Sequence, residues 1–103
     1  MWIFSESFLS IVADKFDPDV LVVRARVEGD IERYFPNAAV LESAGSDYRY
    51  RASIPRKDVI ITVARMIFDI DYPNYKSSLS DHRRSPWYMT VWDSMWRMQE
   101  ALR

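Results

Sequence analysis

The clearest pattern in the chain is a helical repeat of apolar residues over positions 54–72. Apolar side chains return every third or fourth position, which aligns them along one side of an α-helix. They are Val59, Ile60, Val63, Met66, Ile67 and Ile70. Pro55 suits the first turn of a helix and Pro73 cannot continue one. The pattern therefore predicts a helix between these prolines, with Val63 fully buried.

Before this helix, apolar and polar residues alternate with the two-residue period of β-strands. Trp2–Phe4 and Phe8–Ala13 are short apolar segments that predict a hairpin, and residues 20–27 give the clearest strand pattern. A second strand pair is predicted over residues 39–42 and 47–54. Between the two pairs, Gly29 and Asp30 begin a short helix through Phe35, with Asp30 as its cap or first-turn acid.

The two long predicted helices carry more apolar surface than one small sheet can cover. Ile61 and Phe68 lie on the outer side of the first, and we expect the C-terminal helix or a second copy of the chain to cover them. The C-terminal helix is predicted over residues 86–102, with Ser85 as N-cap and Pro86 at the first helical position. Its apolar seam is Tyr88, Val91, Met95, Met98 and Leu102, widened by Trp87, Trp92 and Trp96.

Together these elements predict an α+β fold in a single domain over residues 1–103. We expect an antiparallel sheet of four to five strands with helices on one face. Residues 20–70 fit a ferredoxin-like βαββα arrangement, followed by the C-terminal helix.

Composition narrows the functional classes. The chain of 103 residues has a net charge of −1, so bulk charge favours neither nucleic acid nor a membrane as partner. It has no cysteine, which is compatible with the reducing cytoplasm, and only two glycines, so Gly-rich phosphate loops are absent. No apolar run has the length of a membrane span. We expect a cytoplasmic protein with no cofactor.

The most distinctive group of polar residues is a set of four arginines on two predicted strands: Arg24, Arg26, Arg49 and Arg51. Each pair has i, i+2 spacing, so each points to one face of its strand. On a shared sheet the four guanidiniums could grip phosphates. The plainer interpretation is a solvated face neutralised by Glu28, Glu42 and Asp47. Tyr48 and Tyr50 are predicted on the face opposite the arginines, which weakens a base-stacking role.

Candidate catalytic residues are few. His82 is the only histidine and lies in the polar stretch 71–85, so we expect a solvated loop side chain. Asp69 and Asp71 could bind Mg²⁺ in a nuclease-like site only if the helix ends between them. No catalytic residue and no metal site are predicted.

Several blocks carry a resemblance that covers most of the chain. They are MWIF…FLSIV, VRARVEGDIERYFP, DYRYRASIPR, IDYPNYK and YMTVW. As a set they resemble a family of small bacterial and phage-borne proteins of unassigned activity. The resemblance implies a cytoplasmic, single-domain protein and supplies neither an activity nor site residues.

The function that the sequence predicts is a non-enzymatic protein-binding protein, with homodimer formation as one form. Its predicted interaction surface is Ile61, Phe68, Trp87, Trp92 and Trp96. A narrower version is a phage- or mobile-element-encoded inhibitor of a bacterial defence complex, such as an anti-CRISPR. The alternative is a nucleic-acid-binding module that uses the arginine face, and the third candidate is a small metal-dependent nuclease.

Overall fold

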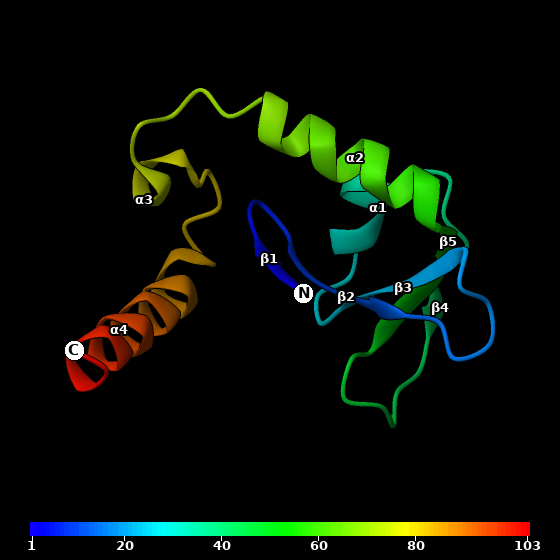
Figure 1. The fold of residues 1–103 in the computed structure, drawn as a ribbon, viewed down its shortest axis with the longest axis horizontal. Coiled ribbons are helices and arrows are strands. Elements are labelled where there is room, and N and C mark those ends of the chain that lie inside the picture. The colour runs from blue at the N-terminus through cyan, green and yellow to red at the C-terminus, as the bar shows by residue number, and fades with distance from the viewer. The chain divides into compact units, whose positions relative to one another are not determined.

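The computed structural model describes all 103 residues. The chain forms two compact units, Met1–Asp71 and Tyr72–Arg103. The first unit contains every strand and the helices α1 and α2, and the second contains α3 and α4 (Figure 1). The fold is α+β, as the sequence predicts. None of the four helices has the length and apolar content that crossing a bilayer requires.

A five-stranded sheet forms the centre of the first unit. Its strands are β1 (Trp2–Phe4), β2 (Phe8–Ala13), β3 (Val20–Ala25), β4 (Leu41–Glu42) and β5 (Tyr50–Pro55). They lie in the order β1-β2-β3-β5-β4, and every neighbouring pair is antiparallel. The predicted hairpin is confirmed residue for residue by β1 and β2, and β3 lies at the centre of the sheet.

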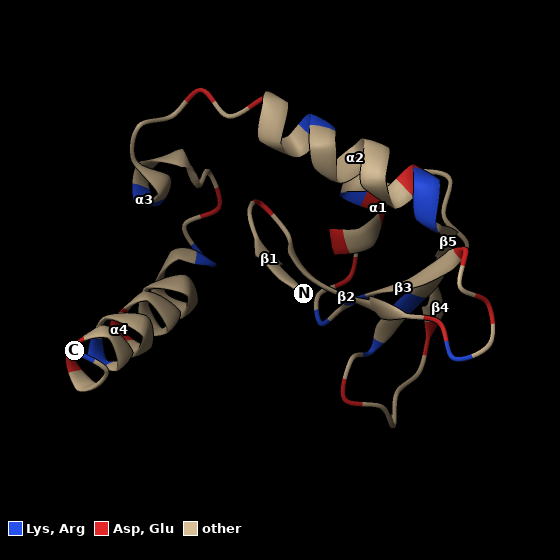
Figure 2. Cartoon of the chain, in the orientation of Figure 1, with Lys and Arg blue, Asp and Glu red and all other residues tan.

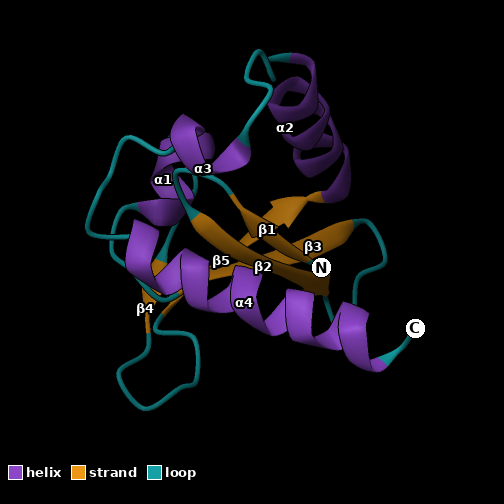
Figure 3. Ribbon diagram, turned by 90° about the vertical axis from the view of Figure 1, so that its left-hand side faces the viewer, coloured by secondary structure: helices purple, strands orange, loops and turns teal.

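One face of this sheet is apolar and is covered by α1 (Asp30–Tyr34) and α2 (Arg56–Phe68). The register places Ile11, Val23 and Ala52 side by side across three strands. The buried cluster on this face consists of Leu9, Ile11, Val23, Ala25, Ile31, Phe35, Ala52, Ile54 and Val59. Both helices of the first unit therefore lie on the same side of the sheet (Figure 1 and Figure 3).

The start of α1 is fixed by a glycine and a buried carboxylate. Gly29 is the N-cap and has a φ of 89°, in the left-handed region that favours glycine. Asp30 is the first helical residue, so it is a first-turn acid and not the cap. Its buried carboxylate accepts a hydrogen bond from the Phe8 N–H at 3.2 Å. This bond joins the β1–β2 hairpin to α1.

Helix α2 follows β5 without a loop, because Pro55 ends the strand and is also the N-cap of the helix. The helix ends at Phe68, which is earlier than predicted. Ile70 lies beyond it in a tighter turn, where its N–H donates to the Ile67 carbonyl. The prediction that Ile70 belongs to the helix is therefore wrong.

The side of α2 that packs on the sheet is centred on Val59, whereas the prediction centred it on Val63. Val59 is the one buried residue of the helix, whereas Val63 is only partly buried against the core. The expectation of a fully buried Val63 is therefore wrong. Ile61 and Phe68, for which a cover was expected, are 60% and 87% exposed.

Three predicted strands are shorter in the structure than in the prediction, and turns lie where residues at the ends of two of them leave the sheet. The strand predicted over residues 20–27 ends at Ala25, and a turn follows in which the Asp30 N–H donates to the Val27 carbonyl. The pair predicted over residues 39–42 and 47–54 is reduced to β4 and β5. Between them the Ser46 hydroxyl donates to the Tyr48 carbonyl at 2.7 Å, which bends the chain ahead of β5.

The second unit begins with α3 (Tyr75–Ser78), inside the stretch predicted as a loop. The Asn74 side chain is the N-cap and accepts a hydrogen bond from the Lys76 N–H at 2.9 Å. Asn is a strong helix initiator because its side chain replaces a missing backbone partner. This signal was present in the sequence and the prediction overlooked it.

The long helix of the second unit is α4 (Ser85–Ala101) (Figure 3). Its N-cap is Arg84, with no side-chain capping bond, so Ser85 is the first helical residue and not the predicted cap. Within this unit Tyr88 and Leu79 are buried. The Lys76 ammonium lies over the Trp92 ring, 4.0 Å from its centroid, which links α3 to α4.

Candidate functional site

The sheet face opposite α1 and α2 carries predicted arginines in a continuous row. The register aligns Trp2, Ser10, Arg24, Arg51 and Leu41 across all five strands. Arg24 and Arg51 are direct partners in the β3–β5 ladder. Arginines from the two predicted strands therefore do share one face of the sheet.

Tyr48 lies on the arginine side, which contradicts the predicted alternation. The Arg24 and Arg26 guanidinium carbons lie over its ring, at 4.3 and 4.1 Å from the centroid. The ring is almost completely buried. The reason for the difference is the bend before β5: strand alternation begins only at Tyr50, so it does not govern the direction of Tyr48.

Each of the four arginines is bound to another part of the chain. Arg24 donates from Nη2 to the buried Ser10 hydroxyl at 2.8 Å. Arg26 donates from Nη1 to the Asp47 carbonyl at 2.7 Å and pairs with its carboxylate at 3.2 Å. The other two arginines bond within the segment that contains β4 and β5. Arg51 donates from Nε to the Tyr48 carbonyl at 3.4 Å, and Arg49 pairs with Glu42 at 3.0 Å.

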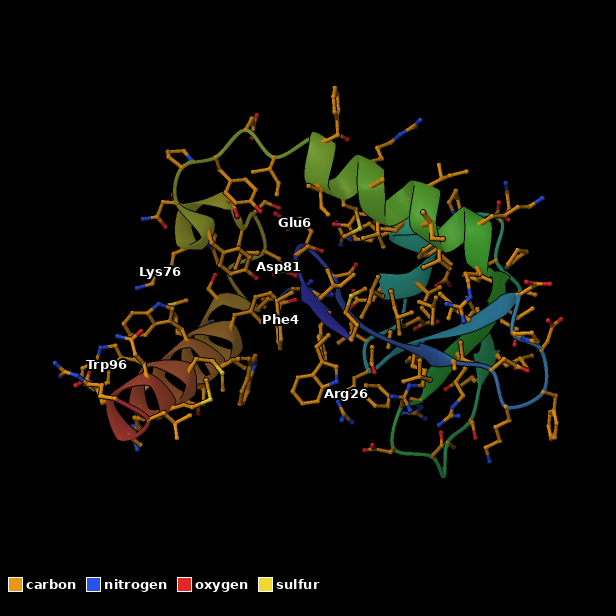
Figure 4. The ribbon with its side chains drawn as sticks, viewed as in Figure 1. Phe4, Glu6, Arg26, Lys76, Asp81 and Trp96 are labelled. Atoms are coloured by element: carbon orange, nitrogen blue, oxygen red, sulfur yellow. The ribbon has the colours of Figure 1, made fainter.

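Two of the four arginines are therefore paired with carboxylates, and three of the four contact Tyr48. Two of the three acids proposed to neutralise it, Glu42 and Asp47, do pair with Arg49 and Arg26. Figure 2 shows acidic positions in the loops beside the basic positions of the sheet. Arg26 lies on the side of the sheet away from α2 (Figure 4). A phosphate at this face would compete with bonds that already exist.

An aromatic cluster borders this face and was not predicted. Phe4 and Phe8 stack with centroids 4.6 Å apart, and Trp2 meets Phe8 edge-on at 5.8 Å. The Phe8 ring also lies 6.4 Å from the Tyr48 ring. The signal was available, because in the predicted hairpin residues of equal parity share a face.

Helix α2 exposes a second apolar surface on its outer side. We call the residues Ile60, Ile61, Ala64, Ile67 and Phe68 the α2 stripe; all five are exposed. Their i, i+1, i+4, i+7, i+8 spacing places them along one side of the helix. Ile61 and Phe68 were predicted to interact, whereas Ile60 and Ile67 were assigned to the core side. Helix α2 is apolar around more of its circumference than the sheet covers.

Helix α4 likewise exposes most of its apolar residues. The exposed large side chains, which we call the α4 surface, are Trp87, Trp92, Met95, Trp96, Met98 and Leu102. The three tryptophans were predicted to interact, and the most exposed of them is Trp87. Trp96, labelled in Figure 4, is about half exposed.

The segment before α4 holds the only histidine of the chain and a set of ion pairs. His82 is exposed, as expected for a loop residue. Its neighbour Asp81 receives two bonds from the Arg83 guanidinium, each 3.1 Å long, and also pairs with Arg84 at 3.4 Å. The Arg83 side chain, more than any other group, lowers the pKa of Asp81 to about 2. These contacts tie the Asp81 carboxylate to the two arginines that follow His82.

The carboxylates considered for a metal site are not gathered into one. Asp69 is the C-cap of α2, and Asp71 follows it in an exposed stretch. Nowhere in the chain do three or more His, Cys, Asp or Glu residues come together in a way that could hold a metal ion.

Fold and surface together define an α+β protein with a helix-covered antiparallel sheet and two exposed apolar helix surfaces. The chain has no match among protein-family models, curated proteins or solved structures.

Proposed function

We propose that this chain is a cytoplasmic, non-enzymatic protein-binding protein. The observation that supports the proposal most is the α2 stripe, five exposed apolar residues along one side of a helix that packs on the core through Val59. Contiguous exposed apolar patches on soluble domains mark interaction sites far more often than scattered apolar residues do. Aromatic residues and methionine, which are abundant on the α4 surface, are also enriched at protein interfaces.

Self-association into a homodimer is the simplest form of this proposal. The test is sedimentation equilibrium of the full chain across micromolar concentrations, with Phe68→Glu as the disrupting variant. A carboxylate in a desolvated apolar contact is costly, so we expect Phe68→Glu to shift the chain to monomer or to abolish partner binding. Phe16→Glu is the matched control, because Phe16 is 93% exposed in a loop outside both surfaces.

An unchanged sedimentation profile and unchanged partner binding in Phe68→Glu would contradict a contact through the α2 stripe. A wild-type chain that is monomeric at every concentration would remove the dimer and leave a foreign protein as the partner.

The narrower form of the proposal is an inhibitor of a bacterial defence complex, encoded by a phage or mobile element. It is supported by small size and by the sequence resemblance to bacterial and phage-borne proteins, not by any single residue. It requires that the purified chain bind a purified defence complex and block the activity of that complex. Phe68→Glu should bind the complex more weakly and inhibit it less than Phe16→Glu does.

A nucleic-acid-binding module remains the second candidate, carried by the arginines of the open face. Arg24, Arg26 and Arg51 already bond to Ser10, Asp47 and Tyr48 respectively. Because these intramolecular bonds must be exchanged for phosphate contacts, this candidate ranks below protein binding.

We also propose that β3, α1, β4, β5 and α2 constitute a ferredoxin-like βαββα portion. The support is the strand order β3-β5-β4 with both helices packed on one face. In this arrangement β2 lies on the other side of β3, although it precedes β3 in the chain, and β1 lies beyond β2.

A further inference from the structure

A hollow of about 350 Å³ opens at the β4 edge of the sheet, within the first unit. Its walls are the end of α1, residues 36–39, the second half of β5 and the first two turns of α2. We call it the edge pocket. Its volume lies at the lower end of the range for pockets that bind small groups.

The edge pocket exists because β4 is much shorter than its neighbour. β4 pairs only with Tyr50 and Arg51, whereas β3 pairs with β5 along its whole length. The Ser43 N–H donates to the Arg49 carbonyl across the β4 side, so the backbone groups of residues 49, 51 and 53 point to that side. The N–H and C=O of Ser53 therefore face the pocket with no strand opposite them.

One charged side chain lines the edge pocket. Asp58, in the first turn of α2, faces the pocket together with Thr62, one helical turn later. Asp58 forms no ion pair with any arginine or lysine of the chain. The remaining walls include apolar surface from Phe35, Ile54 and Pro55. The pocket thus offers a carboxylate, an apolar wall and a stretch of β5 with which no strand pairs.

We propose that the edge pocket binds an extended basic peptide segment of a partner protein. The segment adds to the sheet edge through the Ser53 N–H and C=O, as peptides do in β-augmentation. A lysine or arginine side chain of the segment lays its methylenes against the apolar wall and pairs with the Asp58 carboxylate. This inference rests on the proposed protein-binding function, and it places one anchor of the partner at a site separate from the α2 stripe.

The test uses the ¹⁵N-labelled full chain and the blocked tripeptide acetyl-Val-Lys-Val-amide, followed by two-dimensional NMR. We expect saturable shifts of the Ala39, Ser53, Asp58 and Thr62 amides. Asp58→Asn should weaken binding roughly tenfold, because it replaces a charge-assisted bond by a neutral one. Asp69→Asn makes the same change of charge at the other end of α2 and should leave the affinity unchanged.

The hydrogen bond from the Ser53 N–H to the peptide is tested by two variants of Ser53. Ser53→Pro removes the N–H that the peptide needs and should weaken binding at least as much as Asp58→Asn. Ser53→Ala keeps this N–H and should bind like the wild type. Both variants are first checked for native NMR spectra, and Asp58→Asn decides the outcome if Ser53→Pro does not fold.

Three results would overturn the proposal: no shifts at the named amides, equal binding of the norleucine tripeptide, or equal binding of n-butylamine. The last would show that an amine suffices and that the strand edge has no role. Phe68→Glu should bind the tripeptide normally. A peptide that fails to bind while Phe68→Glu still disrupts association removes the edge pocket alone, and the reverse outcome removes only the α2 stripe.

Discussion

At the scale of single residues, the contacts of the arginines show that they bind other parts of the chain and are not simply solvated charges. The sequence predicts which strand residues share a face, and the direct pairing of Arg24 with Arg51 confirms this for β3 and β5. It could not predict the position of Tyr48, because that residue precedes β5 and its direction is set by a turn hydrogen bond. A ring that was placed with the core instead lies under two guanidiniums.

Arg24 should therefore contribute to stability more than a surface arginine does. Arg24→Ala removes the contact with Tyr48 and leaves the buried Ser10 hydroxyl without its donor. We expect a loss of about 1–3 kcal/mol in the free energy of unfolding, measured by urea denaturation. Arg49→Ala breaks only an exposed pair with Glu42 and should cost less than about 1 kcal/mol. Equal effects of the two variants would show that the Arg24 contacts do not stabilise the fold.

At the scale of elements, α2 shows what an apolar repeat can and cannot predict. The repeat correctly predicts a helix after Pro55, because spacing alone decides which residues share a side. It does not say which part of a broad apolar side meets the sheet. Val59 is buried, Val63 is partly buried and Ile60 is exposed, so the contact is narrower than the repeat.

Val59→Ala and Val63→Ala are a matched pair that tests this orientation. Both variants remove the same two methyl groups from the same helix, so helix propensity changes equally. We expect Val59→Ala to cost roughly 2 kcal/mol of unfolding free energy and Val63→Ala distinctly less, since burial differs. Thermal or urea unfolding measures both. A larger cost for Val63→Ala would mean that α2 is rotated toward the orientation that periodicity alone predicts.

At the scale of the whole molecule, the sequence predicts the class of fold better than it predicts the lengths and pairing of the strands. Alternation and helical repeats yield the order of the strands and long helices along the chain. The strand order in the sheet, the two-residue length of β4 and the edge pocket that results depend on contacts between distant residues. Local patterns carry no information about where such long-range pairing stops.

The core of the protein lies entirely in the first of its two units. Every residue of the buried cluster, and every partly buried apolar residue packed on it, lies before Asp71. A fragment comprising residues 1–71 should therefore fold by itself, with a cooperative urea transition and a dispersed NMR spectrum. Its amide shifts should match those of the same residues in the full chain wherever they lie in the core. Val59→Asp in the fragment is the control for a disrupted core, because it buries an unpaired carboxylate. A fragment whose spectrum resembles that of Val59→Asp would show that residues 72–103 are required for the first unit to fold.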